Sequence, residues 1–139
     1  MIGNTDWSNT TQHNVRVLDK KGQKHIPVPY DFDYSGMVNA PYAIPYDYLP
    51  IKAVTERLYR GICRDAALVQ YVKNDFLMKE EALLSSFDQF QNQLAIQDYR
   101  TTRKYLVDFF AILKNDRAFR DQILRKCEPY EIGVNSDSF

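Results

Sequence analysis

Glycine and proline are divided unevenly along the chain, and this division constrains the fold more than any other feature. Residues 1–61 hold five of the six prolines and four of the five glycines, whereas residues 62–128 hold neither. Because both residues interrupt regular helices, we expect strands, turns and irregular chain first and helices afterwards. The predicted fold class is α+β: a short β-hairpin and an irregular segment pack on three to four α-helices. We expect one domain, made of residues 1–61 and 62–128, and a tail over 129–139.

Apolar residues recur at helical spacing through the second stretch, which predicts amphipathic helices over roughly 64–75, 77–96, 98–114 and 116–127. The stripes consist of Leu68, Val72 and Phe76; Leu83, Phe87, Phe90 and Leu94; Leu106, Phe109, Phe110 and Leu113; and Phe119, Ile123 and Cys127. We expect these side chains to form the core. Asp98 and either Asn115 or Asp116 are the expected helix caps.

The first stretch contains the pattern of a β-hairpin. Val15 to Leu18 form a short candidate strand, Gly22 lies in a turn, and residues 25–30 return as a second strand. The two prolines of the returning strand cannot donate to a ladder, so we expect them at a sheet edge. In an antiparallel pair, Asn14 before the first strand and Asp31 after the second become neighbours in space.

Polar side chains therefore gather at one end of the predicted hairpin: Asp6, Asn14, Asp31 and Asp33. Carboxylate and amide oxygens are ligands that Mg²⁺ accepts, usually beside waters and substrate phosphates. Phosphoryl transfer needs one Asp to orient the attacking hydroxyl, and an Asn and a second Asp to hold the metal. Turn capping explains each residue singly. Their joint position favours a site, since two neighbouring carboxylates repel unless a cation lies between them.

The order of these residues resembles that of a known family. Asp6, then His13-Asn14, a hairpin and Pro29-Tyr30-Asp31-Phe32-Asp33 is similar to the C-terminal half of atypical kinases of the CotH type, and to a bacterial group with a D-F-D-x-S-G stretch. The resemblance implies a kinase C-lobe-like fold and a phosphotransferase that uses Mg²⁺ or Mn²⁺ and ATP. It implies that Asp6 is the catalytic Asp, that Asn14 and Asp31 are metal ligands, and that Asp33 is a further ligand or structural partner.

The sequence departs from the kinase pattern in two respects. Asp6 and Asn14 are eight positions apart, against five in the common signature. The chain also has no Gly-rich loop, strand Lys or partner Glu to hold a nucleotide. We therefore expect an incomplete site that is inactive by itself. We also expect the hydrophobic surface of the chain that an N-lobe would cover to be covered by a missing N-lobe or by self-association.

Other residues near the motif have two interpretations each. Arg57 and Arg60 are candidate cofactor-binding residues facing a phosphate, and structural ion pairs are the alternative. His13 is expected to orient Asn14 or to bond a backbone carbonyl, and Trp7 to pack beside the loop. Two other functions stay open: a non-catalytic interaction module that uses the Tyr-rich segment 42–59, and a cation-binding domain without transfer chemistry.

Composition excludes several classes of partner. Lys plus Arg and Asp plus Glu each total 18, so no net basic charge favours nucleic acid. No apolar run is long enough to span a membrane, and without a signal peptide pattern we expect a cytoplasmic location by default. Cys63 and Cys127 are expected to be separate thiols, with a disulfide as the open alternative.

Overall fold

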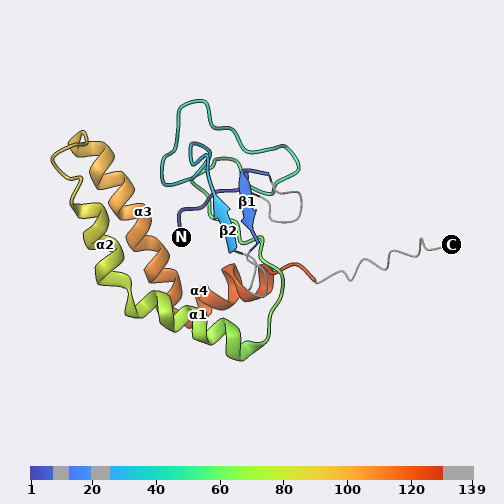
Figure 1. Cartoon of the computed structure of the whole chain (residues 1–139). Coiled ribbons are helices and arrows are strands. Elements are labelled where there is room, and N and C mark those ends of the chain that lie inside the picture. The colour runs from blue at the N-terminus through green and yellow to red at the C-terminus, as the bar shows by residue number, and fades with distance from the viewer. Residues whose placement is uncertain (8–12, 20–25, 130–139) are drawn as a thin grey trace.

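The computed structural model describes residues 1–7, 13–19 and 26–129, and these confirm the α+β fold. The described part contains a two-stranded antiparallel sheet and four α-helices (Figure 1). The elements are β1 (Val15–Leu18), β2 (Ile26–Pro29), α1 (Ala66–Met78), α2 (Glu80–Asp88), α3 (Ile96–Lys114), α4 (Asp116–Gln122) and a 3₁₀ turn, η1 (Leu124–Lys126). Among these residues, no helix is both long and apolar enough to cross a bilayer.

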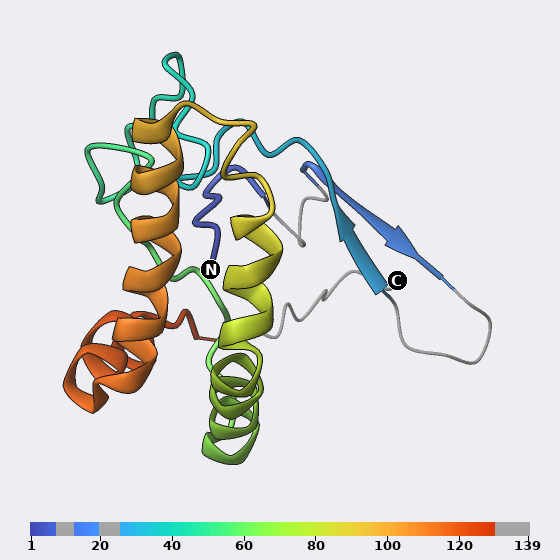
Figure 2. The same ribbon diagram turned by 90° about the vertical axis from the view of Figure 1, so that its left-hand side faces the viewer.

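The two predicted strands pair as an antiparallel hairpin, as expected. Val15 pairs with Pro29 and Leu18 with Ile26. The ladder continues one residue beyond the strands, where Tyr30 N donates to Asn14 O at 3.0 Å. Because hydrogen-bonded and non-bonded pairs alternate, Pro27 and Pro29 take positions whose backbone faces away from β1. The prolines thus cost the ladder no hydrogen bond. The hairpin projects away from the helices (Figure 2).

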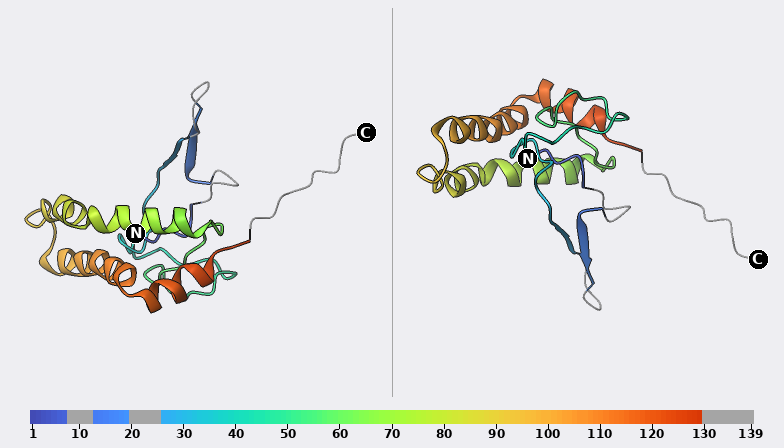
Figure 3. Two further views of the ribbon diagram at one scale, coloured as in Figure 1. Left: turned by 90° about the horizontal axis from the view of Figure 1, so that it is seen from below. Right: turned by 90° about the horizontal axis from the view of Figure 1, so that it is seen from above.

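Helix α3 carries the core. Leu106, Phe109, Phe110 and Leu113 are buried along one of its faces, as their spacing predicts, and Phe119 of α4 joins them. Helices α2 and α3 lie side by side, and α1 and α4 lie at the end of this pair, which leaves the hairpin on its own side of the molecule (Figure 3). The expected core is therefore confirmed for α3.

A helix forms inside the predicted range 77–96, but the predicted end is wrong, because α2 covers only Glu80–Asp88 and the chain turns after Asp88. The Asp88 carboxylate accepts hydrogen bonds from Tyr99 Oη at 2.7 Å and from Arg103 Nε at 2.8 Å. These contacts stabilise a tight reversal from α2 into α3. Phe90 and Leu94, predicted to be core residues, consequently remain 48% and 41% exposed.

Helix caps differ in part from the prediction. The Asn115 side chain caps α4 by accepting from Ala118 N at 2.9 Å, as expected. Asp98 is not a cap, since α3 already begins at Ile96. The cap of α1 is Asp65, which accepts from Leu68 N at 2.8 Å and was not predicted.

The irregular segment is fixed to α3 by one arginine. Arg57 donates hydrogen bonds to the backbone carbonyls of Met1 and Tyr105, and its guanidinium lies 3.7 Å from the centre of the Tyr105 ring. Nearby, Gly36 N donates to Gly3 O at 2.9 Å, and a Cβ at either glycine would collide with the Tyr105 hydroxyl. Close approach of backbone to ring is thus the reason for glycine at both positions.

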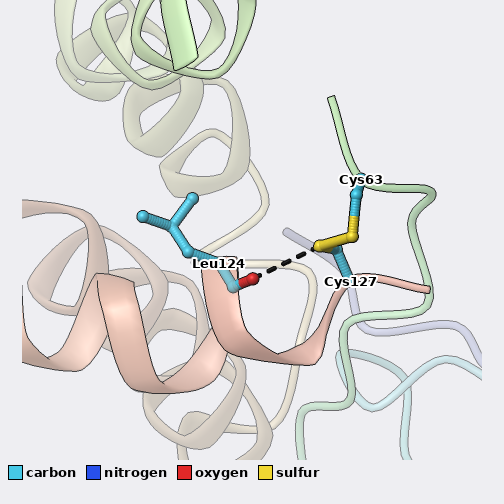
Figure 4. Close-up of a disulfide and its surroundings, with 3 residues drawn as sticks. All are labelled: Cys63, Leu124 and Cys127. Atoms are coloured by element: carbon cyan, nitrogen blue, oxygen red, sulfur yellow. Dashed lines mark hydrogen bonds between the residues drawn. A yellow bond between two sulfur atoms is a disulfide. The ribbon is translucent and has the colours of Figure 1, made fainter. Parts of the chain in front are cut away.

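Cys63 and Cys127 form a disulfide, so the expectation of two separate thiols is wrong (Figure 4). A parallel bridge between Ile62 and Glu128, with Cys63 N donating to Glu128 O at 2.8 Å, brings the two cysteines together. The Cys127 sulfur also lies 3.3 Å from the Leu124 carbonyl oxygen. This is a contact rather than a hydrogen bond, because a disulfide sulfur carries no proton. Sequence spacing gave no sign of the backbone bridge.

Candidate functional site

The base of the hairpin joins Asp6 and Asn14, two of the predicted site residues. Asn14 Nδ2 donates to Asp6 Oδ2 at 2.7 Å, and the Asp6 side chain is only 9% exposed. Asn14 and Asp31 both adopt left-handed backbone conformations, with φ of 52° and 57°. Asn and Asp tolerate this region better than most residues, so local geometry and chemistry both favour these residue types here.

The second oxygen of Asp6 has partners that the sequence did not predict. Tyr46 Oη donates to Asp6 Oδ1 at 2.9 Å, and His13 Nε2 lies 3.3 Å from the same oxygen. The hydrogen bond to Asp6 raises the pKa of Tyr46. Among the described residues, the contact of His13 with Asp6 is one that the sequence did not predict. Asp6 is a nearly buried carboxylate with donors at both oxygens, an arrangement that holds it in one orientation.

Asp31, which is exposed, and Asp33, which is half-buried, form a pair of carboxyl groups near Asp6. The contact with the Asp33 carboxyl raises the pKa of Asp31, and the charge of Asp6 adds to this effect. The same contact, with a hydrogen bond from Tyr42 Oη at 3.1 Å, lowers the pKa of Asp33. Two neighbouring carboxyl groups with pKa values shifted apart share a proton, or accept a cation in its place.

The chemistry of these side chains is of the kind that hard divalent cations prefer. Asp31 and Asp33 carry carboxylate oxygens, and Asn14 directs its amide nitrogen toward Asp6. Within the described ranges, no group of three or more His, Cys, Asp or Glu side chains is placed so that it could hold a metal ion. Mg²⁺ is commonly bound by only one or two carboxylates, together with waters and substrate phosphates.

The two arginines predicted to bind a cofactor bond backbone carbonyls instead of carboxylates. Arg60 Nη1 donates to Thr5 O at 2.8 Å, one residue before Asp6. Arg57 contacts Met1 and Tyr105, on the side of α3. In the part of the chain that the structure describes, neither arginine forms an ion pair, so the alternative expectation of structural ion pairs is wrong. Arg60 is the nearer of the two to the predicted site.

Trp7 stabilises the loop that carries Asp31. Its indole Nε1 lies 2.9 Å from Tyr30 O and 3.0 Å from Asp31 O, and its ring packs edge-on against Phe32 with centroids 4.8 Å apart. The expected packing role is confirmed, with a hydrogen-bonding role added. Asn4 also reaches this loop, where its Nδ2 lies 3.3 Å from Asp31 O.

Comparison of the chain with protein-family models, with curated proteins and with solved structures finds no match. The functional argument therefore rests on the residues and their geometry.

Proposed function

We propose that this chain is the metal- and phosphate-binding portion, corresponding to a C-lobe, of a kinase-like phosphotransferase. The observation that supports the proposal is the meeting of three segments at the hairpin base. Asp6 is hydrogen-bonded to Asn14 at 2.7 Å, and the Asp31–Asp33 pair lies close enough to Asp6 to be affected by its charge. An orienting Asp, an Asn and a second Asp are the groups that phosphoryl transfer requires.

Each residue has a distinct role in this proposal. Asp31 and Asp33, with the Asn14 oxygen, hold Mg²⁺ or Mn²⁺, which neutralises phosphate charge when bound. Asp6 orients the acceptor hydroxyl and takes up its proton. Tyr46 Oη already donates to Asp6 Oδ1 at 2.9 Å. It therefore holds the place that an acceptor hydroxyl needs, and has to move aside during transfer.

The proposal separates metal binding from nucleotide binding. The sequence has no Gly-rich loop and no strand Lys–Glu pair for the phosphates. We accordingly expect the 139-residue chain to bind Mn²⁺ and to hold ATP only weakly. A second polypeptide segment that supplies the missing groups is needed for efficient transfer.

The first test is a thermal melt of the chain with millimolar Mn²⁺, with and without ATP. Mn²⁺ should raise the melting temperature of the parent, because a ligand that binds only the folded state stabilises it. Asp31→Asn should abolish this increase. Asp98→Asn is the matched control, since Asp98 is an exposed carboxylate in the first turn of α3. Equal Mn²⁺ stabilisation of the parent and Asp31→Asn would remove the proposal.

One observation favours a second function, a non-catalytic interaction module. Tyr42, Ile44 and Tyr48 are 61%, 72% and 71% exposed on one irregular segment, and aromatic residues are enriched at protein interfaces. Tyr48→Ser should then reduce recovery of a partner in a pull-down, with no effect on Mn²⁺ stabilisation. Unchanged recovery with the variant would argue against this function.

A further inference from the structure

Residues 127–129, which follow η1, are held to the rest of the chain by few contacts. Cys63 N donates to Glu128 O at 2.8 Å, and Glu128 N donates to Gly61 O at 2.9 Å. Glu128 and Pro129 are both exposed, and within the described part of the chain the Glu128 carboxylate forms no hydrogen bond or ion pair. The disulfide between Cys63 and Cys127 is therefore the main additional link that holds this segment in place.

The two backbone hydrogen bonds are too few to hold the segment by themselves. Each hydrogen bond adds little net stability, because the same groups bond to water when the segment is released. Fixing the backbone of residues 127–129 costs conformational entropy at every residue. The disulfide offsets this cost, since it keeps the two partner segments adjacent. We therefore expect the bridge between Ile62 and Glu128 to persist while the disulfide is intact and to open when it is reduced.

The disulfide lies where a thiol in solution can reach it. Cys63 is exposed and Cys127 is half-buried. Figure 4 shows the two sulfur atoms beside the end of η1, with Cys63 on the segment that precedes α1. Thiol–disulfide exchange requires a thiolate to contact one of the two sulfur atoms, so an exposed disulfide is reduced more readily than a buried one.

We propose that the Cys63–Cys127 disulfide is a redox-controlled latch, which a dithiol opens and which releases residues 127–129. A thiolate of the dithiol attacks the Cys63 sulfur, the bond between the two sulfurs breaks, and Cys127 leaves as a thiolate that takes up a proton. The second thiol of the reagent then attacks the mixed disulfide, and Cys63 leaves in the same way. The dithiol becomes a disulfide, and the protein gains two electrons and two protons.

Opening the latch changes the apolar surface of the molecule. Ile62, Ile123 and Leu124 line a hollow of about 290 Å³ together with Cys127, and none of the residues that line it belongs to α3. When Cys127 leaves this lining, the apolar side chains become more exposed, whereas the core face of α3 stays packed. The reduced protein is thus a folded form with additional exposed apolar surface. This inference does not depend on the metal site at the hairpin base.

Native-state hydrogen exchange of the parent, followed by NMR before and after reduction with dithiothreitol, measures the release directly. In the oxidised protein the amides of Cys63 and Glu128 should be protected, because each donates a bridge hydrogen bond. In the reduced protein both should exchange at the rate of an unfolded peptide. The amides of Phe110 and Leu113, in the α3 core, should still exchange at least about tenfold more slowly than an unfolded peptide. Oxidised glutathione should restore protection of the bridge.

Two controls separate the latch from other effects of the reagent. The double variant Cys63→Ser, Cys127→Ser should have an open bridge and a protected α3 core, with or without dithiothreitol. The rate of reduction is the second control. Dithiothreitol should reduce the folded parent within about tenfold of the rate at which it reduces the parent unfolded in urea, because the disulfide is accessible in the fold.

Several results would overturn the proposal. Protection of Cys63 and Glu128 in the reduced parent would mean that the bridge does not need the disulfide. Loss of protection at Phe110 and Leu113 together with the bridge, or a double variant that circular dichroism shows to be unfolded, would mean that the disulfide supports the whole fold. Reduction that occurs only in urea would mean that the disulfide is inaccessible in the folded protein, which also contradicts a latch.

Discussion

The disulfide makes the strongest quantitative prediction for stability. It joins residues 64 positions apart, Cys63 before α1 and Cys127 after η1, so it closes a loop around all the helices. In the chain-entropy model, closing a loop of this length removes about 14 cal/mol/K from the unfolded state, or about 4 kcal/mol at 25 °C. Replacing both cysteines by serine should thus lower the free energy of unfolding by about 4 kcal/mol.

Urea denaturation followed by circular dichroism measures this loss. The double serine variant should unfold at a lower midpoint. Its dependence on urea should be steeper, since the open chain exposes more surface when unfolded. Reducing agent should shift the parent to the same midpoint and leave the serine variant unchanged. That comparison separates loss of the covalent bond from an effect of the serine side chains.

Two results would refute this reasoning at different levels. A loss below about 1 kcal/mol in both the reduced parent and the serine variant would mean that loop closure contributes little here. Two reactive thiols in the unreduced, unfolded parent would mean that the pairing itself is wrong.

Three further predictions concern the contacts around α3. Burial, with the charge of Arg57 adding to it, lowers the pKa of the Met1 amine from 8.0 to about 6. Between these values the unfolded chain binds a proton that the folded chain does not. The free energy of unfolding should therefore rise from pH 6 to pH 8 by about 2 kcal/mol, and urea melts should show a flat profile after N-terminal acetylation. Arg57→Leu leaves two backbone carbonyls without their donor and should cost about 1–3 kcal/mol by chemical denaturation, whereas a loss near zero would contradict the clamp. Gly36→Ala should cost about 1–3 kcal/mol, because the new Cβ meets the Tyr105 hydroxyl and the Val54 carbonyl. Adding Tyr105→Phe should restore only part of that loss, and full recovery would exclude the backbone clash.

Local patterns predicted the elements of the fold well. The spacing of Leu106, Phe109, Phe110 and Leu113 identified the buried face of α3, because one helical face against one core follows directly from a period of 3.6 residues. The hairpin followed from two short candidate strands, an expected turn between them and the restricted positions of the prolines. The bond between Asn14 and Asp6 is consistent with the cluster expected at the hairpin base.

Long-range contacts were beyond prediction from one sequence. Tyr46 reaches Asp6 across 40 positions, and Cys63 reaches Cys127 across 64. Both contacts depend on how the irregular segment and the chain after η1 fold back, and no local periodicity encodes that path. The wrong end of the helix predicted over 77–96 has a related cause, because Asp88 is held by Tyr99 and Arg103, which lie in the following helix.

The proposed metal site at the hairpin base is the central claim, and paramagnetic broadening by Mn²⁺ tests it most directly. In ¹H–¹⁵N spectra of the parent, substoichiometric Mn²⁺ should first broaden amide signals near Asp31, Asp33 and Asn14, and Asp31→Asn should remove this selective effect. That variant removes one of several neighbouring carboxylates, so Asp33 and Asp6 lose an unfavourable neighbouring charge and the fold should stay intact. Uniform broadening over all exposed carboxylates, or identical broadening in parent and variant, would contradict a cation site at this position.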